Sequence, residues 1–111
     1  MKQHITVEQL IELSKEQRQR LKEWWKPQNH DVFIYGHHSE INQIHNVEKF
    51  LGKENALPLL SIGQMIELLE IELINPMPSS WEVEYYQDKK LCITSAEELT
   101  DALFKAVKQV L

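Results

Sequence analysis

Imidazole side chains, the commonest ligands of transition metals, gather in one part of this sequence. Four histidines lie close together beside Asp31: His30, His37, His38 and His45. Imidazole and carboxylate groups suit zinc or a similar ion. The spacing does not match a standard helical site, and in a strand His37 and His38 would point to opposite faces. We therefore expect a solvated polar loop, and a metal-binding or small-ligand-binding module built on the segment His30–His45 is the alternative.

Carboxylates are the next candidates for chemistry, and they form three groups. These groups are Glu67, Glu70 and Glu72; Glu82 and Glu84; and Glu97, Glu98 and Asp101. General acid–base catalysis needs a pair whose pKa values are pushed apart inside a pocket, and nothing in the sequence marks one. The third group has a structural explanation, because acidic residues in a first helical turn stabilise the helix dipole.

Nucleophiles and phosphate-binding loops are not recognisable either. The single cysteine, Cys92, cannot form an intrachain disulfide or a cysteine-based zinc site, and no basic residue closely flanks it. Ser61 and Ser95 stand where helix caps are expected, and neither has a histidine near it in the sequence. No glycine belongs to a loop that could cradle a phosphate. We predict that the protein is not an enzyme, with no catalytic residue, no metal and no cofactor.

Large aromatic side chains are the best candidates for contact with a partner. Trp24 and Trp25 are neighbours on an expected helix, where their side chains point about 100° apart. One of them can therefore lie in the core while the other lies at its margin, although core packing of both is favoured. A partly exposed tryptophan is a frequent interface anchor. The predicted interaction surface comprises Trp24 and Trp25, with Trp81 and Tyr86 as a second choice.

Composition limits the class of protein and of partner. The chain has 111 residues, 42% hydrophobic and 26% charged, which is typical of one globular domain spanning residues 1–111. Its net charge of −5 and pI near 5.5 disfavour a phosphate backbone, so nucleic acid is not expected as a partner. The basic side chains between positions 15 and 26 are interspersed with Glu16 and Glu23, a mixture that is typical of a solvated helix face. Without a long apolar run or a signal-like start, we expect a cytoplasmic protein with no membrane contact.

Helix-start signatures supply the elements that must position these residues. Four times a Ser or Thr precedes a Gln or Glu by three residues, the spacing of a capping box. The pairs are Thr6 with Gln9, Ser14 with Gln17, Ser61 with Gln64, and Ser95 with Glu98. They predict helices over residues 7–13, 15–26, 62–73 and 96–111, with residues 57–60 leading into the third and Pro27 ending the second.

Strand signals lie between these helices. Residues 81–86 alternate apolar and acidic side chains, and with residues 91–94 they predict a hairpin closed by a turn at residues 87–89. Residues 31–35 predict a further strand. Ile41 and Ile44 fit either its return strand, which we favour, or a helical turn leading to Val47 and Phe50. The expected class is α+β, a small mainly antiparallel sheet of one or two hairpins with three to four helices packed on one face.

Three segments resemble small uncharacterised proteins encoded by phages and prophages of Firmicutes. They are EQRQRLKEWWKP at residues 16–27, LPLLSIGQMIELLE at 57–70 and ELTDALFKAVKQVL at 98–111, together about a third of the chain. The matching residues are caps and helix faces, so the resemblance concerns the scaffold and supplies no site residue.

The resemblance implies a phage or prophage accessory protein. With no recognisable catalytic centre, we expect it to act by protein–protein interaction, for instance on an anti-phage defence factor. The expected partner is a host or phage protein, or a second copy of the chain.

Overall fold

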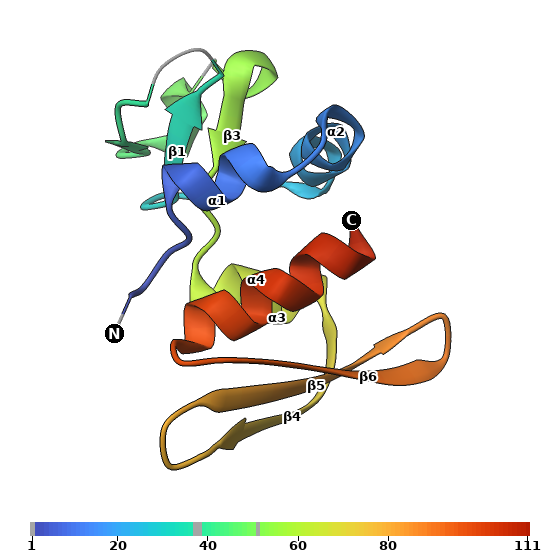
Figure 1. The fold of residues 1–111 in the computed structure, drawn as a ribbon. Coiled ribbons are helices and arrows are strands. Elements are labelled where there is room, and N and C mark those ends of the chain that lie inside the picture. Colours follow the sequence, from blue (N-terminus) through green and yellow to red (C-terminus); the bar gives the residue numbers. More distant parts are fainter. Residues whose placement is uncertain (1, 37–38, 51) are drawn as a thin grey trace. The chain divides into compact units, whose positions relative to one another are not determined.

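The computed structural model describes residues 2–36, 39–50 and 52–111. Over these residues the chain forms four α-helices and two three-stranded antiparallel sheets, which confirms the expected α+β class (Figure 1). The two sheets belong to two compact units. We call Thr6–Leu59 the N-terminal unit, and Leu60–Leu111 with the chain start up to Ile5 the C-terminal unit.

The N-terminal unit begins with two short helices, α1 (Val7–Glu12) and α2 (Lys15–Trp24). Both predicted capping boxes are present. At α1, the Thr6 hydroxyl accepts from the Gln9 amide at 3.1 Å, and the Gln9 side chain accepts from the Thr6 amide at 2.9 Å. The helix starts were therefore predicted correctly, because each cap involves only residues three apart.

Three short strands form the sheet of this unit, in the order β2-β1-β3. They are β1 (Val32–Tyr35), β2 (Asn42–Gln43) and β3 (Ala56–Pro58). The favoured return strand is confirmed as β2, although it has only two residues and is followed by a 3-10 turn, Val47–Lys49. A second 3-10 turn, Lys53–Asn55, precedes β3.

The prediction that residues 57–60 lead directly into the third helix was wrong at Leu57 and Pro58, which belong to β3. Leu57 and Pro58 pair with β1 instead, opposite Ile34 and Phe33. The residue before a proline favours extended backbone, and an edge strand tolerates the missing proline amide. Both rules fit the observed strand.

An aromatic cluster holds the N-terminal unit together. Trp25, Phe33, Ile44 and Ala56 are buried, and Trp24, Val47 and Phe50 pack against them. The rings of Phe33 and Phe50 meet edge to face with their centroids 5.0 Å apart. Aromatic pairs in this geometry add to the stabilisation that burial provides.

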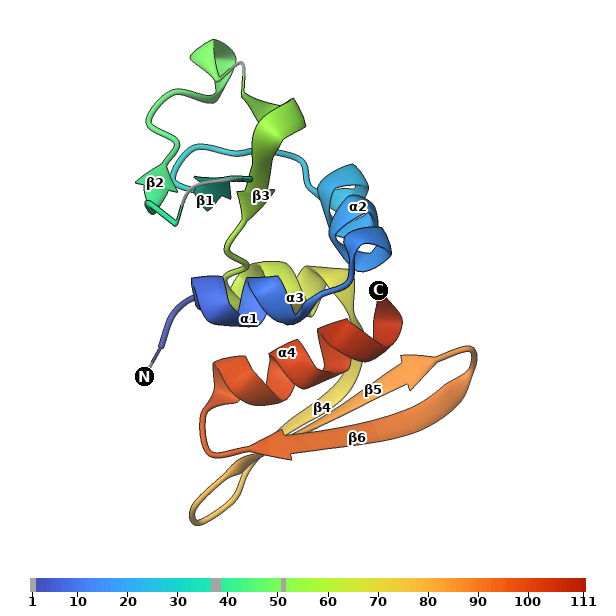
Figure 2. The ribbon, with the colours of Figure 1, turned by 45° about the horizontal axis from the view of Figure 1, so that its top comes forward.

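In the C-terminal unit, one helix precedes the three strands in the chain and another follows them. Its elements are α3 (Ile62–Leu68), β4 (Glu70–Pro76), β5 (Trp81–Gln87), β6 (Lys90–Ala96) and α4 (Leu99–Val110). The sheet order is β4-β5-β6. Figures 1 and 2 show α3 and α4 on the same side of this sheet. The Thr94 hydroxyl of β6 donates to the Ala102 carbonyl of α4 at 2.8 Å, which fixes which face of the sheet meets the helices.

The third helix was predicted too long, because residues 70–76 form β4 and not its continuation. Ile71 lies opposite Tyr85 and Ile74 opposite Val83 in the ladder with β5. Branched side chains such as those of Ile71 and Ile74 favour strands when a partner strand is available.

The second hairpin was predicted correctly. Strands β5 and β6 pair from Trp81 opposite Ala96 to Gln87 opposite Lys90. The two residues between them, Asp88 and Lys89, have positive φ angles of 51° and 65°, as a type I′ turn requires.

The fourth predicted cap was wrong. Ser95 lies in β6 opposite Glu82, and α4 begins three residues later than expected, after Glu98, whose side chain makes no capping hydrogen bond. The ladder with β5 competes with the local cap for the backbone of residues 95 and 96, and the ladder prevails.

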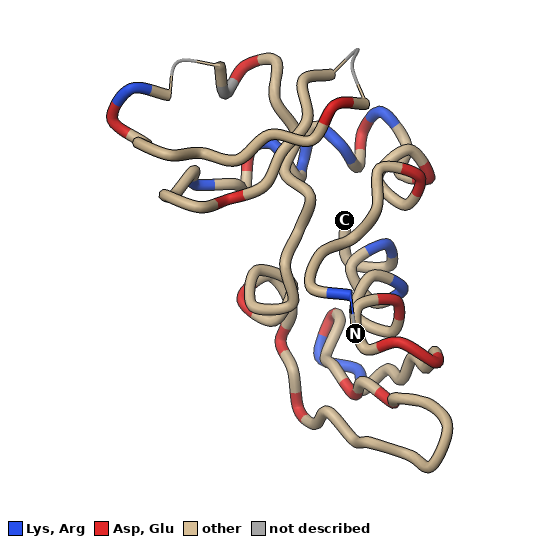
Figure 3. The backbone as a smooth tube through the Cα atoms, turned by 90° about the vertical axis from the view of Figure 1, so that its left-hand side faces the viewer, with Lys and Arg blue, Asp and Glu red and all other residues tan. Residues whose placement is uncertain are grey.

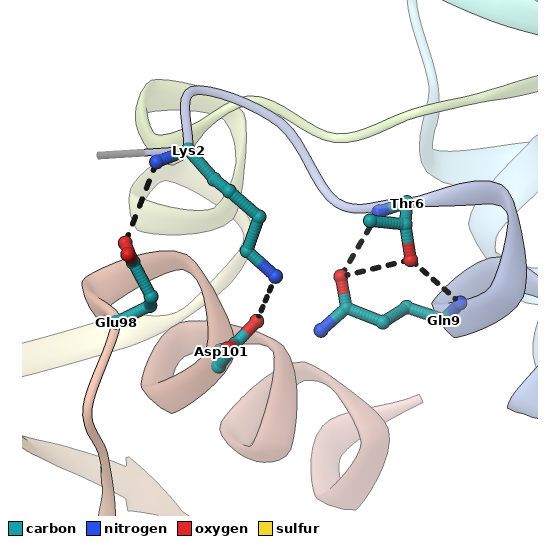
Figure 4. A network of polar contacts seen from close by, with 5 residues as sticks. All are labelled: Lys2, Thr6, Gln9, Glu98 and Asp101. Atoms are coloured by element: carbon teal, nitrogen blue, oxygen red, sulfur yellow. Dashed lines mark hydrogen bonds and ion pairs between the residues drawn. The ribbon is translucent and has the colours of Figure 1, made fainter.

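The start of the chain is tied to the first turn of α4 (Figure 4) and to the segment that precedes α3 in the same unit. Lys2 contacts both ends of the first turn of α4: its backbone amide lies 3.4 Å from Glu98 Oε2, and its ammonium lies 2.6 Å from Asp101 Oδ1. The Ile5 amide donates to the Leu60 carbonyl at 2.9 Å. Residues at opposite ends of the chain therefore belong to one compact unit.

Candidate functional site

Helices α3 and α4 of the C-terminal unit both lie on one side of its sheet, and we call the other side the outer sheet face. Because paired residues of neighbouring strands share a face, its nine residues follow from the register. They form three rows across β4, β5 and β6: Glu70, Tyr86 and Leu91; Leu73, Glu84 and Ile93; and Asn75, Glu82 and Ser95.

The alternation of β5 sends its side chains to opposite sides of the sheet. Val83 and Tyr85 point toward the helices and are buried, whereas Glu82, Glu84 and Tyr86 point outward. This is the two-sided pattern that the sequence predicts for residues 81–86.

A β-bulge decides which residue of β4 joins the outer sheet face. The register shifts between Ile71 and Leu73, so that Glu72 is inserted without a partner of its own. Without this shift, Leu73 would lie on the same face as Ile71 and point toward the helices. The bulge turns Leu73 outward, next to Glu84, and turns Ile74 inward.

Four large apolar side chains are exposed on this face. Ile93 is 60% exposed, Leu91 49%, Leu73 47% and Tyr86 37%. Tyr86 lies directly opposite Leu91, and Leu73 and Ile93 lie on either side of Glu84. Single exposed apolar residues are ordinary on protein surfaces, whereas a contiguous group indicates an interaction site.

The charge of the outer sheet face has one sign. Among its nine residues there are three glutamates, Glu70, Glu82 and Glu84, and no lysine or arginine. The C-terminal unit has five basic and nine acidic residues, and the N-terminal unit has seven and eight. The net charge of −5 is therefore concentrated in the C-terminal unit, and Figure 3 shows where the charged residues lie along the backbone. The face combines apolar area with negative charge.

The residues predicted for contact with a partner differ in their exposure, and Trp81 and Tyr86 lie on opposite faces of their sheet. Trp25 is 1% exposed, and its indole N–H donates to Asp31 Oδ2 at 2.9 Å. Trp24 is half-buried against the same cluster. In the other unit, Trp81 is half-buried and lies in register with Ala96, one row beyond the outer sheet face and on the opposite side. Of the four, Tyr86 alone is classed as exposed and belongs to the outer sheet face.

The histidine segment shows no metal centre in the part of the chain that the structure describes. His37 and His38 lie outside the described residues, and His30 and His45 are both exposed. Among described residues, no three histidine, cysteine or acidic side chains are placed to hold an ion. Asp31, a predicted neighbour of such a site, accepts hydrogen bonds from the Trp25 indole and the Gln28 amide.

Cys92 and Tyr85 form a cross-strand pair on the helix side of the sheet. Burial raises the pKa of the Tyr85 phenol, and the neighbouring Cys92 raises it further. Cys92 is half-buried.

Leu73, Leu91 and Ile93 are exposed apolar residues of the outer sheet face that the sequence analysis did not single out. For Leu91 and Ile93 a signal existed, because the predicted hairpin register places them beside Tyr86 and Glu84. For Leu73 there was none, since its orientation depends on the bulge.

The helices of the described residues are not long and apolar enough to cross a membrane.

Known proteins supply no further constraint on either unit. No protein-family model matches the chain, and neither a curated protein nor a solved structure does.

Proposed function

We propose that this chain is a non-enzymatic accessory protein that binds another protein through the outer sheet face. The partner presents apolar side chains flanked by lysine or arginine. As the sequence resemblance implies, this partner is a host or phage protein. The observation that supports the proposal is the contiguous exposed group of Leu73, Tyr86, Leu91 and Ile93 around acidic residues.

The apolar group supplies the attraction. Fully burying a large aliphatic or aromatic side chain contributes about 1.5–3 kcal/mol. Each of the four side chains is already partly covered by its neighbours, so covering the rest contributes about 1 kcal/mol per residue. Tyrosine is also among the residue types enriched in binding hot spots, and Tyr86 lies beside Leu91.

The carboxylates select the partner. Glu70, Glu82 and Glu84 favour a basic surface and accelerate its association at low salt. The same charges disfavour contact between two copies of this face, because the carboxylates of one copy would meet those of the other. They also disfavour a phosphate backbone. A basic and apolar segment of a different protein satisfies all of these conditions.

Site-specific photo-crosslinking in cells tests the proposal. A photoreactive phenylalanine analogue replaces Ile93 on the outer sheet face, and in a matched control it replaces Ile66 of α3, which is 38% exposed. The partner captured at position 93 is then purified, and its affinity for the full chain is measured by calorimetry. Capture alone does not count as support.

The affinity of variants decides the outcome. We expect Ile93→Asp to weaken binding about fivefold or more, because about 1 kcal/mol of apolar contact is lost and a carboxylate must give up water in its place. Glu84→Lys should weaken binding and reduce its salt dependence, and Ile66→Asp should leave it unchanged. Equal crosslinking at positions 93 and 66, or equal affinity of the Ile93→Asp and Ile66→Asp variants, would contradict the proposal.

A further inference from the structure

The N-terminal unit contains a groove with two adjoining compartments. One has a volume of about 360 Å³ and lies between α2 and the segment that precedes β3, and the other has a volume of about 230 Å³. Arg18, Gly36 and Leu57 line both, so the two compartments form one groove. Its dimensions are those of sites for small molecules.

The larger compartment is cationic. Lys15, Arg18 and Lys22 line it, and their spacing of three and four residues places them on one side of α2. Glu54 is the acidic residue of this lining. Three positive charges and one negative charge give the compartment a net positive charge, although the chain as a whole is acidic.

Donor groups remain available to a ligand there. The Lys22 ammonium donates to the Glu54 carbonyl at 2.7 Å, which holds the side chain across the groove and uses one of its three N–H donors. The guanidinium of Arg18 is half-buried and makes no hydrogen bond or ion pair with the residues that the structure describes. A guanidinium binds carboxylates and phosphates through two parallel hydrogen bonds.

The smaller compartment is mainly apolar. Val7, Leu10 and Ile11 of α1 line it together with Ile34 of β1. Ile11 is 63% exposed, the most exposed large apolar side chain among the described residues. A ligand that reached this compartment would cover part of an apolar surface that now faces solvent.

We propose that this groove binds a small amphiphilic anion, a phosphate monoester or carboxylate attached to an apolar body. The anionic group contacts Arg18 with Lys15 and Lys22, and the apolar body lies against Val7 and Ile11. Neither half of the groove alone requires such a ligand. Their junction at Arg18 and Leu57 places the positive charge and the apolar wall within reach of one molecule.

Titration of the full chain with four probes tests this proposal. Octyl phosphate and octanoate carry both features, inorganic phosphate lacks the apolar body, and octyltrimethylammonium has the opposite charge. Binding is followed by ¹⁵N–¹H NMR spectra below the micelle concentration of each probe. We expect octyl phosphate, octanoate or both to shift the amides of Arg18, Gly36 and Leu57 and to bind at least tenfold more tightly than inorganic phosphate. The cationic probe should leave these amides unshifted.

Three variants assign the binding to the groove. Arg18→Gln is expected to weaken the anionic amphiphile about tenfold or more, since a charge-assisted hydrogen-bonded pair is lost. Ile11→Ser, at an exposed position, should weaken octyl phosphate while leaving inorganic phosphate unchanged. Lys26→Gln removes the same charge from an exposed residue outside the groove lining and should have no effect.

Equal effects of Arg18→Gln and Lys26→Gln would overturn the proposal, as would shifts caused equally by the cationic probe or an absence of shifts with both anionic amphiphiles. The test is independent of the proposed function, because Ile93→Asp on the outer sheet face should leave octyl phosphate binding unchanged.

Discussion

Replacing Trp25 with phenylalanine tests whether this tryptophan belongs to the interior or to a surface. Its ring is 1% exposed and packs against Phe33 and Phe50, at centroid distances of 6.3 and 5.9 Å. Its indole N–H donates to Asp31 Oδ2 at 2.9 Å. Phenylalanine keeps an aromatic ring in the cluster and removes the donor.

The expected loss of stability follows from two terms. A hydrogen bond to a charged group contributes about 1.5–3 kcal/mol. The smaller ring leaves unfilled volume, whose cost is a fraction of the roughly 3–5 kcal/mol measured when a large aromatic is truncated to alanine. Asp31 keeps its hydrogen bond from the Gln28 amide at 3.0 Å, which reduces the penalty. We expect Trp25→Phe to lower the free energy of unfolding by about 2–3 kcal/mol.

Urea unfolding followed by circular dichroism measures this loss. Trp24→Phe is the matched control, because Trp24 is half-buried at the margin of the same cluster and should lose less than about 1 kcal/mol. A double-mutant cycle with Asp31→Ala should show a coupling of about 1 kcal/mol or more. Equal losses at Trp24 and Trp25, together with additive effects in the cycle, would refute the buried position of Trp25.

Three further predictions concern the C-terminal unit. Ser61→Ala should cost about 1 kcal/mol, since Ser61 caps α3, whereas Ser95→Ala should change stability by less than about 0.5 kcal/mol because Ser95 is an exposed strand residue; equal losses in urea unfolding would contradict this. Burial raises the pKa of Tyr85 above the ordinary 10.0, so the unfolded chain loses this proton first and stability should decline as pH rises above 10.0. In Tyr85→Phe, the urea midpoint should fall less between neutral and alkaline pH than it does in the unmodified protein. An equal fall in both proteins would show that Tyr85 does not cause the loss of stability. Lys2→Ala should cost less than about 1 kcal/mol, and less still at high salt, because the ion pair with Asp101 is partly exposed; a salt-independent loss would show that the pair does not act through charge.

The capping boxes show where sequence reasoning succeeds. The caps at Thr6, Ser14 and Ser61 each join residues three apart, so nothing distant is needed to form them. The β5–β6 hairpin was equally accessible, because its two strands are separated only by Asp88 and Lys89. The same reasoning failed at Ser95, where pairing with Glu82 competes with the local signal.

The candidate surfaces were harder to predict for the same reason. Tyr86 was recognised, but the apolar neighbours that make its surface contiguous come from two other strands. The basic residues of α2 were expected to form a solvated face. In the structure, Lys15, Arg18 and Lys22 line a groove that is also lined by Gly36, Glu54, Asn55 and Leu57.

The α+β class, three of the four helix caps and the two faces of β5 follow from the amino-acid sequence alone, because these depend on hydrogen bonds and side-chain alternation within a few residues. Contacts between distant segments make strands of residues 56–58 and 70–76, turn Leu73 outward, and bring charge and apolar surface together at Arg18. A mixture of apolar and acidic residues such as that over residues 65–74 fits both helical and strand periods over short lengths. The ladder hydrogen bonds offered by another segment then settle which structure forms.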